Sequence, residues 1–172
     1  MMNKKDVVIV LTALLLSGFA APALAGSATT TFTVTATVNP NCTISAANLG
    51  FGNYDPLVTN LAAPLNATST VTVACVKGTT ATIGLNAGLN SAQAVATTRA
   101  MSSGGLTPSF LSYEIYKDVN RTLVWGNAGL TTVSYTAASN ANSIITDYGQ
   151  VPAAQTPPTG SYTDTITATI NF

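Results

Sequence analysis

Residues 28–42 read ATTTFTVTATVNPNC, which is the most regular β-strand pattern in the chain. Apolar side chains recur at every second position, Phe32, Val34, Ala36 and Val38, and threonines stand between them. Because successive side chains of a strand point to opposite faces, this alternation predicts a strand with one apolar and one polar face. The strand would stand at the front of the mature chain, where ends usually fray, so its position calls for a partner.

The first 25 residues have the features of a secretory signal peptide. Lysines at residues 4–5 precede an almost wholly apolar run at residues 7–16, and residues 23–25 form a small-x-small cleavage pattern. The run is shorter than the roughly 20 residues that a membrane-spanning helix needs, although a retained membrane anchor is the alternative. We expect cleavage between Ala25 and Gly26 and export of the chain.

The sequence after the signal peptide has the size of one domain with a proper core: removing 25 of the 172 residues leaves 147. It carries four lysines and arginines against five aspartates and glutamates, a net charge of −1. Nucleic-acid binding draws most of its affinity from neutralised phosphates, so this charge excludes a nucleic-acid partner and, likewise, an anionic membrane surface. Scarce charge also leaves strand edges open to association, so either the edges are covered or association is the purpose.

The mature chain has two cysteines, Cys42 and Cys75. In an exported protein this pair predicts a disulfide, which would close a loop of about 34 residues and contribute about 3–4 kcal/mol in the chain-entropy model. Two free thiols are the alternative, and they fit only a reducing compartment. A structural zinc site is weaker still, because the chain has no histidine to complete the ligand set.

Short alternating segments separated by turn signals dominate the rest of the chain. Two hairpins are expected, one joining residues 68–76 to 80–87 through a tight turn at 77–79, and one within residues 111–126. Further strands are expected at 130–135 and 161–172, and loops at 53–66, 97–109 and 151–160. No segment keeps a helical apolar period beyond two turns, so the pattern predicts an all-β sandwich or barrel.

Candidate catalytic residues are sparse, because the lack of histidine removes the commonest general base and metal ligand. Asp55 and Glu114 are candidates for a glycosidase-like carboxylate pair. However, Asp55 precedes a proline, as turn residues do, and Glu114 has the position of a solvated strand residue. Trp125, the only tryptophan, is expected in the core rather than at a sugar-binding surface. We therefore expect no catalytic residues, cofactor or metal site.

Five segments in this order resemble the spore coat protein U family, which includes the subunits of archaic (Csu-type) chaperone–usher pili. The segments are NCTISAANLGFGNYDP (41–56), VTVACVKGTTATIGLNAG (71–88), RAMSSGG (99–105), LSYEIYKDVNRTLVWG (111–126) and GSYTDTITATINF (160–172). The resemblance covers essentially the whole mature chain. Its specificity lies in the ordered set, with two cysteines where the family has its bridge and a closing G-x-Y-x-D strand.

The resemblance implies an incomplete immunoglobulin-like β-sandwich over residues 39–172 that lacks its final strand. In such proteins a periplasmic chaperone lends a strand to the open groove, and at the outer-membrane usher the N-terminal extension of the next subunit replaces it. Residues 26–38 would then be a donor-strand extension, whose inserted side chains are Phe32, Val34, Ala36 and Val38. The last strand would flank the groove through Tyr162, Ile166, Ala168, Ile170 and Phe172. The alternative is that the front strand folds back as an edge strand of its own domain.

We therefore expect a non-enzymatic structural subunit of a secreted chaperone–usher pilus, exported through the periplasm to the cell surface, that serves attachment and biofilm formation. Its expected partners are a periplasmic chaperone, an outer-membrane usher and identical or related subunits. Two other functions stay open: an adhesin that recognises a surface, and a spore or cyst coat protein that assembles without an usher. The resemblance implies a second domain in a tip adhesin, so one domain with a donor-like front strand argues against it.

Overall fold

The structure is a computed structural model that describes residues 25–94 and 97–172. The predicted signal peptide lies outside these residues except for Ala25, at the expected cleavage site. The chain divides into two units, Met1–Ala36 and Thr37–Phe172. Among the described residues, no helix is long and apolar enough to cross a membrane.

The N-terminal extension (residues 26–38) forms neither helix nor strand. Its alternating apolar side chains are exposed, with exposed fractions of 84% for Phe32, 81% for Val34 and 77% for Val38. An isolated strand leaves its N–H and C=O groups without ladder partners, so alternation alone does not make a strand. The strand expected over residues 28–42 therefore begins only at Cys42, and no edge strand is present between residues 25 and 41.

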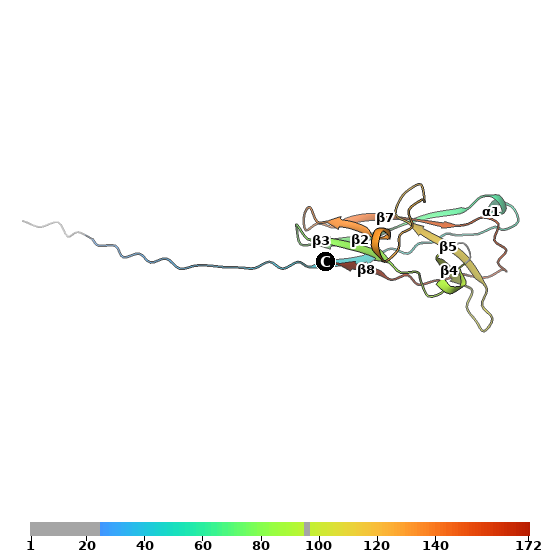
Figure 1. Ribbon diagram of the computed structural model, residues 1–172, viewed down its shortest axis with the longest axis horizontal. Helices are drawn as coiled ribbons and strands as arrows, with labels where there is room; N and C mark the ends of the chain where they lie inside the picture. Colours follow the sequence, from blue (N-terminus) through green and yellow to red (C-terminus); the bar gives the residue numbers. More distant parts are fainter. Residues whose placement is uncertain (1–24, 95–96) are drawn as a thin grey trace, which may run out of the picture. The chain divides into compact units, whose positions relative to one another are not determined.

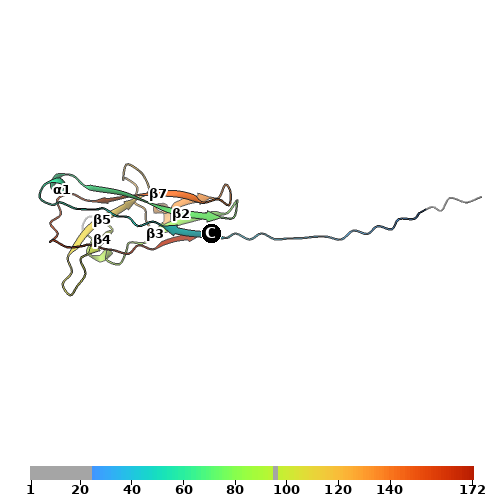
Figure 2. The ribbon, with the colours of Figure 1, turned by 180° about the vertical axis from the view of Figure 1, so that it is seen from behind.

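The second unit is all-β, with eight strands in two sheets within the described residues (Figures 1 and 2). The five-stranded sheet has the order β1 (Cys42–Ala46), β2 (Leu65–Cys75), β7 (Ser143–Val151), β5 (Phe110–Tyr116), β4 (Arg99–Ser102). The three-stranded sheet has the order β6 (Val133–Thr136), β3 (Thr80–Leu85), β8 (Ala168–Asn171). Every pair in the two sheets is antiparallel. Three short helices complete the described elements: α1 (Thr59–Ala62), η1 (Ser91–Gln93) and η2 (Gly129–Thr131).

The hydrophobic core lies between the two sheets, because inward side chains of both sheets belong to one cluster. Trp125 is fully buried in it, and its Nε1–H donates to the Ile83 carbonyl at 2.9 Å. This arrangement confirms the expectation that the tryptophan is a core residue. The remaining buried members come from β2, β3, β5 and β7: Val71, Val73, Ile83, Leu85, Leu111, Tyr113, Ile115 and Val151.

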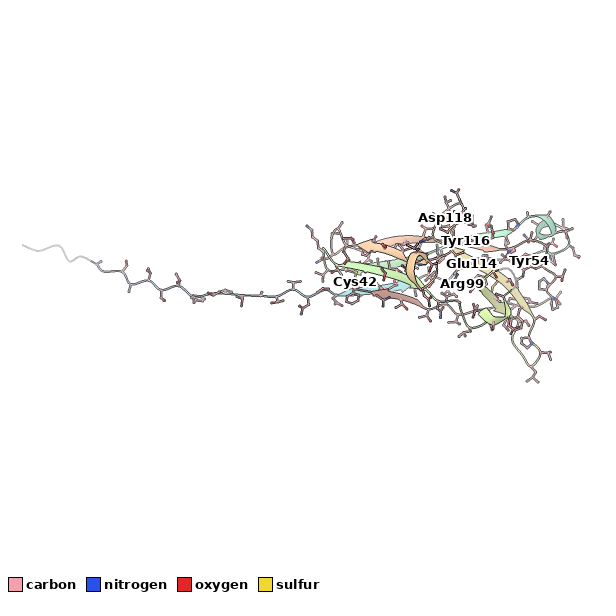
Figure 3. All side chains as sticks on the ribbon, viewed as in Figure 1. Cys42, Tyr54, Arg99, Glu114, Tyr116 and Asp118 are labelled. Atoms are coloured by element: carbon pink, nitrogen blue, oxygen red, sulfur yellow. A yellow bond between two sulfur atoms is a disulfide. The ribbon has the colours of Figure 1, made fainter. Side chains whose placement is uncertain are left out.

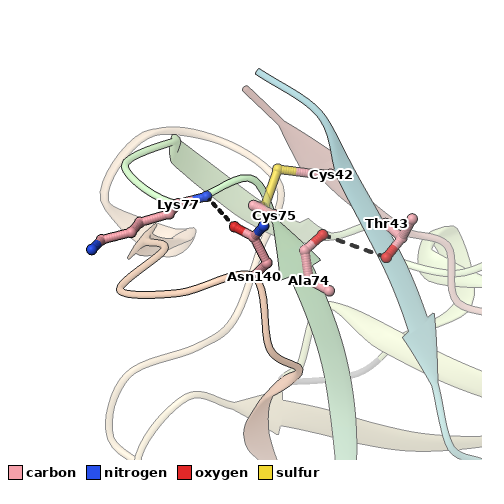
Figure 4. The surroundings of a disulfide bond; sticks show 6 residues. All are labelled: Cys42, Thr43, Ala74, Cys75, Lys77 and Asn140. Atoms are coloured by element: carbon pink, nitrogen blue, oxygen red, sulfur yellow. Dashed lines mark hydrogen bonds between the residues drawn. A yellow bond between two sulfur atoms is a disulfide. The ribbon is translucent and has the colours of Figure 1, made fainter. Parts of the chain in front are cut away.

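The predicted disulfide between Cys42 and Cys75 is present (Figure 4). The two cysteines are directly opposite each other in the β1–β2 ladder. The neighbouring Thr43 Oγ1 donates to the Ala74 carbonyl across the same ladder, at 3.4 Å. The bridge therefore fixes the first residue of β1 to the end of β2.

The first hairpin prediction is wrong about strand pairing, whereas the second is confirmed over a short stretch. The turn at residues 77–79 is tight, and Thr79 N–H donates to the Val76 carbonyl at 3.0 Å. However, β2 pairs with β1 and β7, whereas β3 pairs with β6 and β8, so the turn carries the chain from one sheet to the other. In residues 111–126 the chain does fold back on the end of β5 after the predicted turn: Tyr116 bridges Val124, the Lys117 N–H donates to the Leu123 carbonyl at 2.9 Å, and the Trp125 N–H donates to the Ile115 carbonyl at 2.8 Å. The longer partners of β5 are β4 and β7. Alternation identifies a strand but not its partner.

Four segments also differ from expectation. The segment 97–109, expected to be a loop, contains β4, and the expected loop at 53–66 contains α1 and the start of β2. The segment 143–151 forms β7, a central strand that the apolar pattern did not predict. The strand expected over residues 161–172 shortens to β8, preceded by a bridge from Thr163 to Ser102.

Candidate functional site: an open apolar groove

Two cavities of about 580 and 520 Å³ open between the sheets, and both are lined by Leu49, Phe51, Met101 and Tyr162. Because they share these residues, we treat them as one groove. Its first wall is residues 46–56, which follow β1, and its second wall is residues 157–168, which lead into β8. At one end of the domain β1 and β8 lie side by side, near Cys42, and Tyr54 of the first wall lies toward the other end (Figure 3).

The first wall belongs to no strand after Ala46, yet its apolar side chains pack against the core. The Phe51 ring meets the Tyr113 ring edge-on, with centroids 5.9 Å apart. Gly149 of β7 makes this approach possible, because a Cβ there would lie 2.7 Å from Leu49 Cδ2 and 2.8 Å from Phe51 Cζ. After Ala47, whose N–H donates to the Thr70 carbonyl of β2 at 2.9 Å, the wall is held by side chains.

In the second wall half-buried and exposed residues alternate, but the wall is not a continuous strand. Tyr162, Ile166 and Ala168 are half-buried and line the groove, and Ile170 packs against the core beyond it. Phe172 is 57% exposed and lines neither cavity. β8 is the edge strand of its sheet, paired with β3 on one side. Its other edge therefore has main-chain groups available for a further strand.

Asp164 fixes the second wall to the core. Its carboxylate accepts hydrogen bonds from the Tyr113 hydroxyl at 2.8 Å, the Leu89 N–H at 2.9 Å and the Asn90 side-chain amide at 3.1 Å. Burial, followed by the hydrogen bond from Tyr113 to Asp164, raises the pKa of Tyr113 and keeps it a donor. Gly88 has a positive φ of 78°, and a Cβ there would lie 2.0 Å from Asp164 Oδ2, so only glycine fits. The closing G-x-Y-x-D segment therefore preserves the shape of the groove.

A second carboxylate, Asp147 on β7, lies in the floor of the groove beside Ala46 and Ala47. It is only 5% exposed, and its Oδ1 has no hydrogen-bond partner among the described residues. Burial raises the pKa of this carboxyl, while hydrogen bonds from the Ser69 and Asp147 N–H groups oppose the shift. Nothing in the apolar pattern of the sequence distinguished this residue.

Glu114 was expected to be solvated, and that expectation is wrong. It is 3% exposed and forms an ion pair with Arg99, which is 1% exposed (Figure 3). Glu114 also accepts from the Thr98 N–H at 2.9 Å and from the Thr98 hydroxyl at 2.7 Å. Arg99 donates in turn to the carbonyls of Trp125 at 2.7 Å and Asn86 at 2.8 Å. A buried carboxylate is tolerated here because a cation and hydrogen-bond donors surround it.

Asp55 has the other expected role, that of a turn residue. Its Oδ1 accepts from the Leu57 N–H at 3.0 Å and from the Val58 N–H at 3.2 Å. Asp55 and Glu114 thus belong to separate hydrogen-bond networks, and the structure does not support a paired-carboxylate site. No group of three or more His, Cys, Asp or Glu residues that could hold a metal ion occurs in residues 25–94 and 97–172.

Comparison with known proteins gives one curated relative and two solved structures of interest. "Protein U" of Myxococcus xanthus is 37% identical over 160 residues, covering 88% of each chain. The fold is similar to the chaperone–tip adhesion subunit pre-assembly complex CsuC–CsuE of archaic Csu pili from Acinetobacter baumannii. The TM-score is 0.54 and the identity 24%, and the match covers 79% of this chain but only 41% of that one.

The minor tip subunit HdaB of the E. coli Hda pilus gives a TM-score of 0.36 at 16% identity, over 76% of this chain and 79% of that one, too low to indicate a shared fold. The model of the Spore Coat Protein U domain matches residues 28–169. The match spans both walls of the groove and most of the N-terminal extension. The chain belongs to the Spore Coat Protein U domain family.

Proposed function

We propose that this chain is a structural subunit of a chaperone–usher pilus and that it polymerises by donor-strand complementation. The observation that carries the proposal is the open groove, whose second wall ends in an edge strand with one unpaired side. An incomplete sandwich exposes apolar floor residues and main-chain groups that an added strand would cover. The fold shared with a subunit crystallised with its chaperone supports the same proposal.

The N-terminal extension has the complementary features. Its apolar residues Phe32, Val34, Ala36 and Val38 alternate and are exposed in this chain. Burying the three larger side chains in a neighbour's groove would contribute about 5–9 kcal/mol, and each ladder hydrogen bond about 1 kcal/mol more. Since each subunit would give a strand and receive one, the contact is head-to-tail and does not close, which produces a filament.

Before assembly, the same groove would bind a chaperone. A periplasmic chaperone would fill it with a strand of its own, and exchange at the outer-membrane usher would replace that strand with the extension of the next subunit. The disulfide fits an exported protein, and the proposed location is a pilus at the cell surface that serves attachment and biofilm formation. In this proposal the chain has no catalytic role, and its partners are proteins rather than nucleic acid.

An unboiled SDS gel of the exported chain, co-expressed with chaperone and usher, tests the proposal. We expect a ladder of SDS-resistant multimers that collapses on boiling and that is absent when residues 26–38 are deleted. Val34→Asp should abolish the ladder because it places a charge on the inserted face, whereas Thr35→Asp, on the opposite face, should retain it. A folded monomer in every lane would contradict donor-strand polymerisation.

A second candidate function is a coat protein that assembles without an usher. The observation that favours it is the 37% identity to Protein U over most of both chains, together with the family's description. Expression without chaperone and usher separates the two: a coat protein should assemble from the isolated chain, whereas a pilus subunit should need both partners.

A further inference from the structure

The turn at residues 57–61, which contains the start of α1, has its polar and apolar side chains in the reverse of the usual arrangement. Leu57, Val58 and Leu61 are 82%, 74% and 58% exposed. Asn60, which lies among them in the sequence, is only 2% exposed. A helix that merely covers a core buries its apolar side chains and exposes its polar ones. We call the three exposed side chains the α1 patch, and exposed apolar groups that gather in this way mark interaction sites.

Hydrogen bonds fix this reversed arrangement. The Asn60 side chain accepts from the Asp55 N–H at 2.9 Å and donates to the Ala63 carbonyl at 3.0 Å. The Asn60 carbonyl accepts from the Ala154 N–H at 2.9 Å, which ties the turn to the segment after β7. Because Asn60 is held inside, the α1 patch is held at the surface.

The α1 patch adjoins one end of the groove. Pro56, which precedes Leu57, lines the larger cavity together with residues 157–162 of the second wall. α1 lies at this end of the domain, and Phe172 lies at the other end, where β8 contacts β1 (Figures 1 and 2). The patch is therefore continuous with the surface on which the donor strand of the proposed function would lie.

The direction of an added strand decides at which end it leaves the groove. Every strand pair of the domain is antiparallel. An added strand that continues this pattern runs opposite to the second wall, which passes from residue 157 at the α1 end to β8 at the other. The C-terminal end of the added extension, after Val38, therefore leaves the groove beside the α1 patch.

The connection from the extension to its own domain is short. Only residues 39–41 separate Val38 from Cys42, the first residue of β1. Four Cα–Cα steps span at most about 13–14 Å, and Pro40 restricts its own backbone and that of the residue before it. A subunit whose extension fills a neighbour's groove must therefore place its Cys42 end against the α1 end of that neighbour.

The Cys42 end of the domain carries an exposed aromatic side chain that can meet the patch. Phe172 is 57% exposed and lines neither cavity, so the groove does not account for it. Large aromatic side chains often supply much of the binding energy of protein interfaces. The two ends of one domain thus carry apolar groups that face each other only when two copies join end to end.

We propose that the α1 patch is a docking face for the Phe172 end of a second copy of this chain. The inference rests on the proposed function and adds to each joint of the filament a second contact, outside the groove. With the strand alone, neighbouring domains are joined only through residues 39–41. Apolar packing beside this connection would restrict how far the two domains bend relative to each other.

Crosslinking tests the contact in filaments of the full chain, co-expressed with chaperone and usher. In chains that carry both Leu61→Cys and Phe172→Cys, a short bismaleimide should join neighbouring subunits, so that the SDS ladder survives boiling. The matched control is Val119→Cys with Phe172→Cys. Val119 is 63% exposed, about as much as Leu61, and follows Asp118, which lies between the two ends of the domain (Figure 3). The control ladder should collapse on boiling, as that of the wild type does.

Maleimide labelling of Leu61→Cys alone distinguishes a second copy from another occupant. In intact filaments this cysteine should be protected, and after boiling it should be labelled fully, whereas Val119→Cys should be labelled equally in both conditions. A reactive Leu61→Cys and no crosslink, with the ladder intact, would overturn the contact, leave donor-strand polymerisation standing and assign the patch to a partner outside the filament. Loss of the ladder from the wild type itself would instead overturn the proposed function, and the contact with it.

Discussion

Glu114 and Asp147 lie on neighbouring strands of one sheet, and both carboxylates are buried, yet their surroundings differ completely. Glu114 has a cation and several donors around it, all from its own domain. Asp147 lines the groove, and its buried Oδ1 has no hydrogen-bond partner among the described residues. The difference separates a polar cluster that the domain satisfies by itself from a carboxylate that it satisfies only in part, whereas a finished core usually pairs its polar groups internally.

The largest expected effect comes from disrupting the ion pair between Arg99 and Glu114. Arg99→Met should lower the free energy of unfolding by about 3–5 kcal/mol, because it leaves the Glu114 charge buried and unpaired. Urea unfolding followed by Trp125 fluorescence measures the change at the site, since Arg99 donates to the Trp125 carbonyl. The exposed Lys77→Met is the control and should change stability by less than about 0.5 kcal/mol. If Arg99→Met lowered the free energy of unfolding by no more than the control does, the ion pair would not stabilise the domain.

Asp164 gives an intermediate case, a carboxylate at the groove that does have partners. Asp164→Asn should destabilise the chain by about 1–3 kcal/mol, because the hydrogen bonds from Tyr113 and Leu89 lose their charged acceptor. The same urea titration checks this. Asp118→Asn is the comparison, since that carboxylate accepts bonds in an exposed turn, and its effect should be smaller. Equal effects would show that the second wall is not held through Asp164.

Asp147→Asn should act in the opposite direction in the free chain. It removes a buried charge that has no cation beside it in the lining of the groove, so stability at neutral pH should rise by about 1–2 kcal/mol. Urea unfolding of the monomer measures this directly. A destabilisation of similar size would indicate that the carboxylate is satisfied within its own domain.

The smallest effect is a pH dependence with a defined sign. Because the pKa of Asp147 is raised above its ordinary 3.8, the folded chain binds a proton that the unfolded chain has already lost in the window between the two values. The free-energy cost of burying the ionised Asp147 carboxylate is therefore complete above the raised pKa. This cost disappears as the pH falls through the raised pKa toward 3.8. The difference in the free energy of unfolding between Asp147→Asn and wild type should therefore narrow as the pH falls through this window. A gap independent of pH would contradict the burial argument.

How much the sequence could predict depended on whether a residue's partner was near in the chain. The alternation in β2, β3 and the second wall was recognised, because it is a local property. β7 was missed because Asp147 and Gly149 interrupt its apolar face, and those two residues serve the groove rather than the strand pattern. The strand partner was wrong for the first hairpin, because a tight turn can also connect two sheets.

For the residues of the site, too, the sequence predicted some positions and missed others. Tyr162, Ile166 and Ala168 were placed at the groove from a family resemblance and line it in the structure, whereas Phe172 does not. Glu114 was misjudged because its ion-pair partner, Arg99, lies 15 residues away on another strand. Charge on a strand suggests solvent unless the fold supplies a counter-charge, and only the three-dimensional structure reveals one.

The disulfide at Cys42 has a mechanical consequence for the proposed filament. Tension between subunits would enter each domain along the extension, and Cys42 is the first strand residue that it reaches. There the load passes through a covalent bond to Cys75 of β2, which is paired on both sides by β1 and β7. Stretching single filaments with and without reductant would compare the two conditions. Without the bond, the β1–β2 hydrogen bonds would be opened one at a time from their end; with it, the force is shared across the sheet.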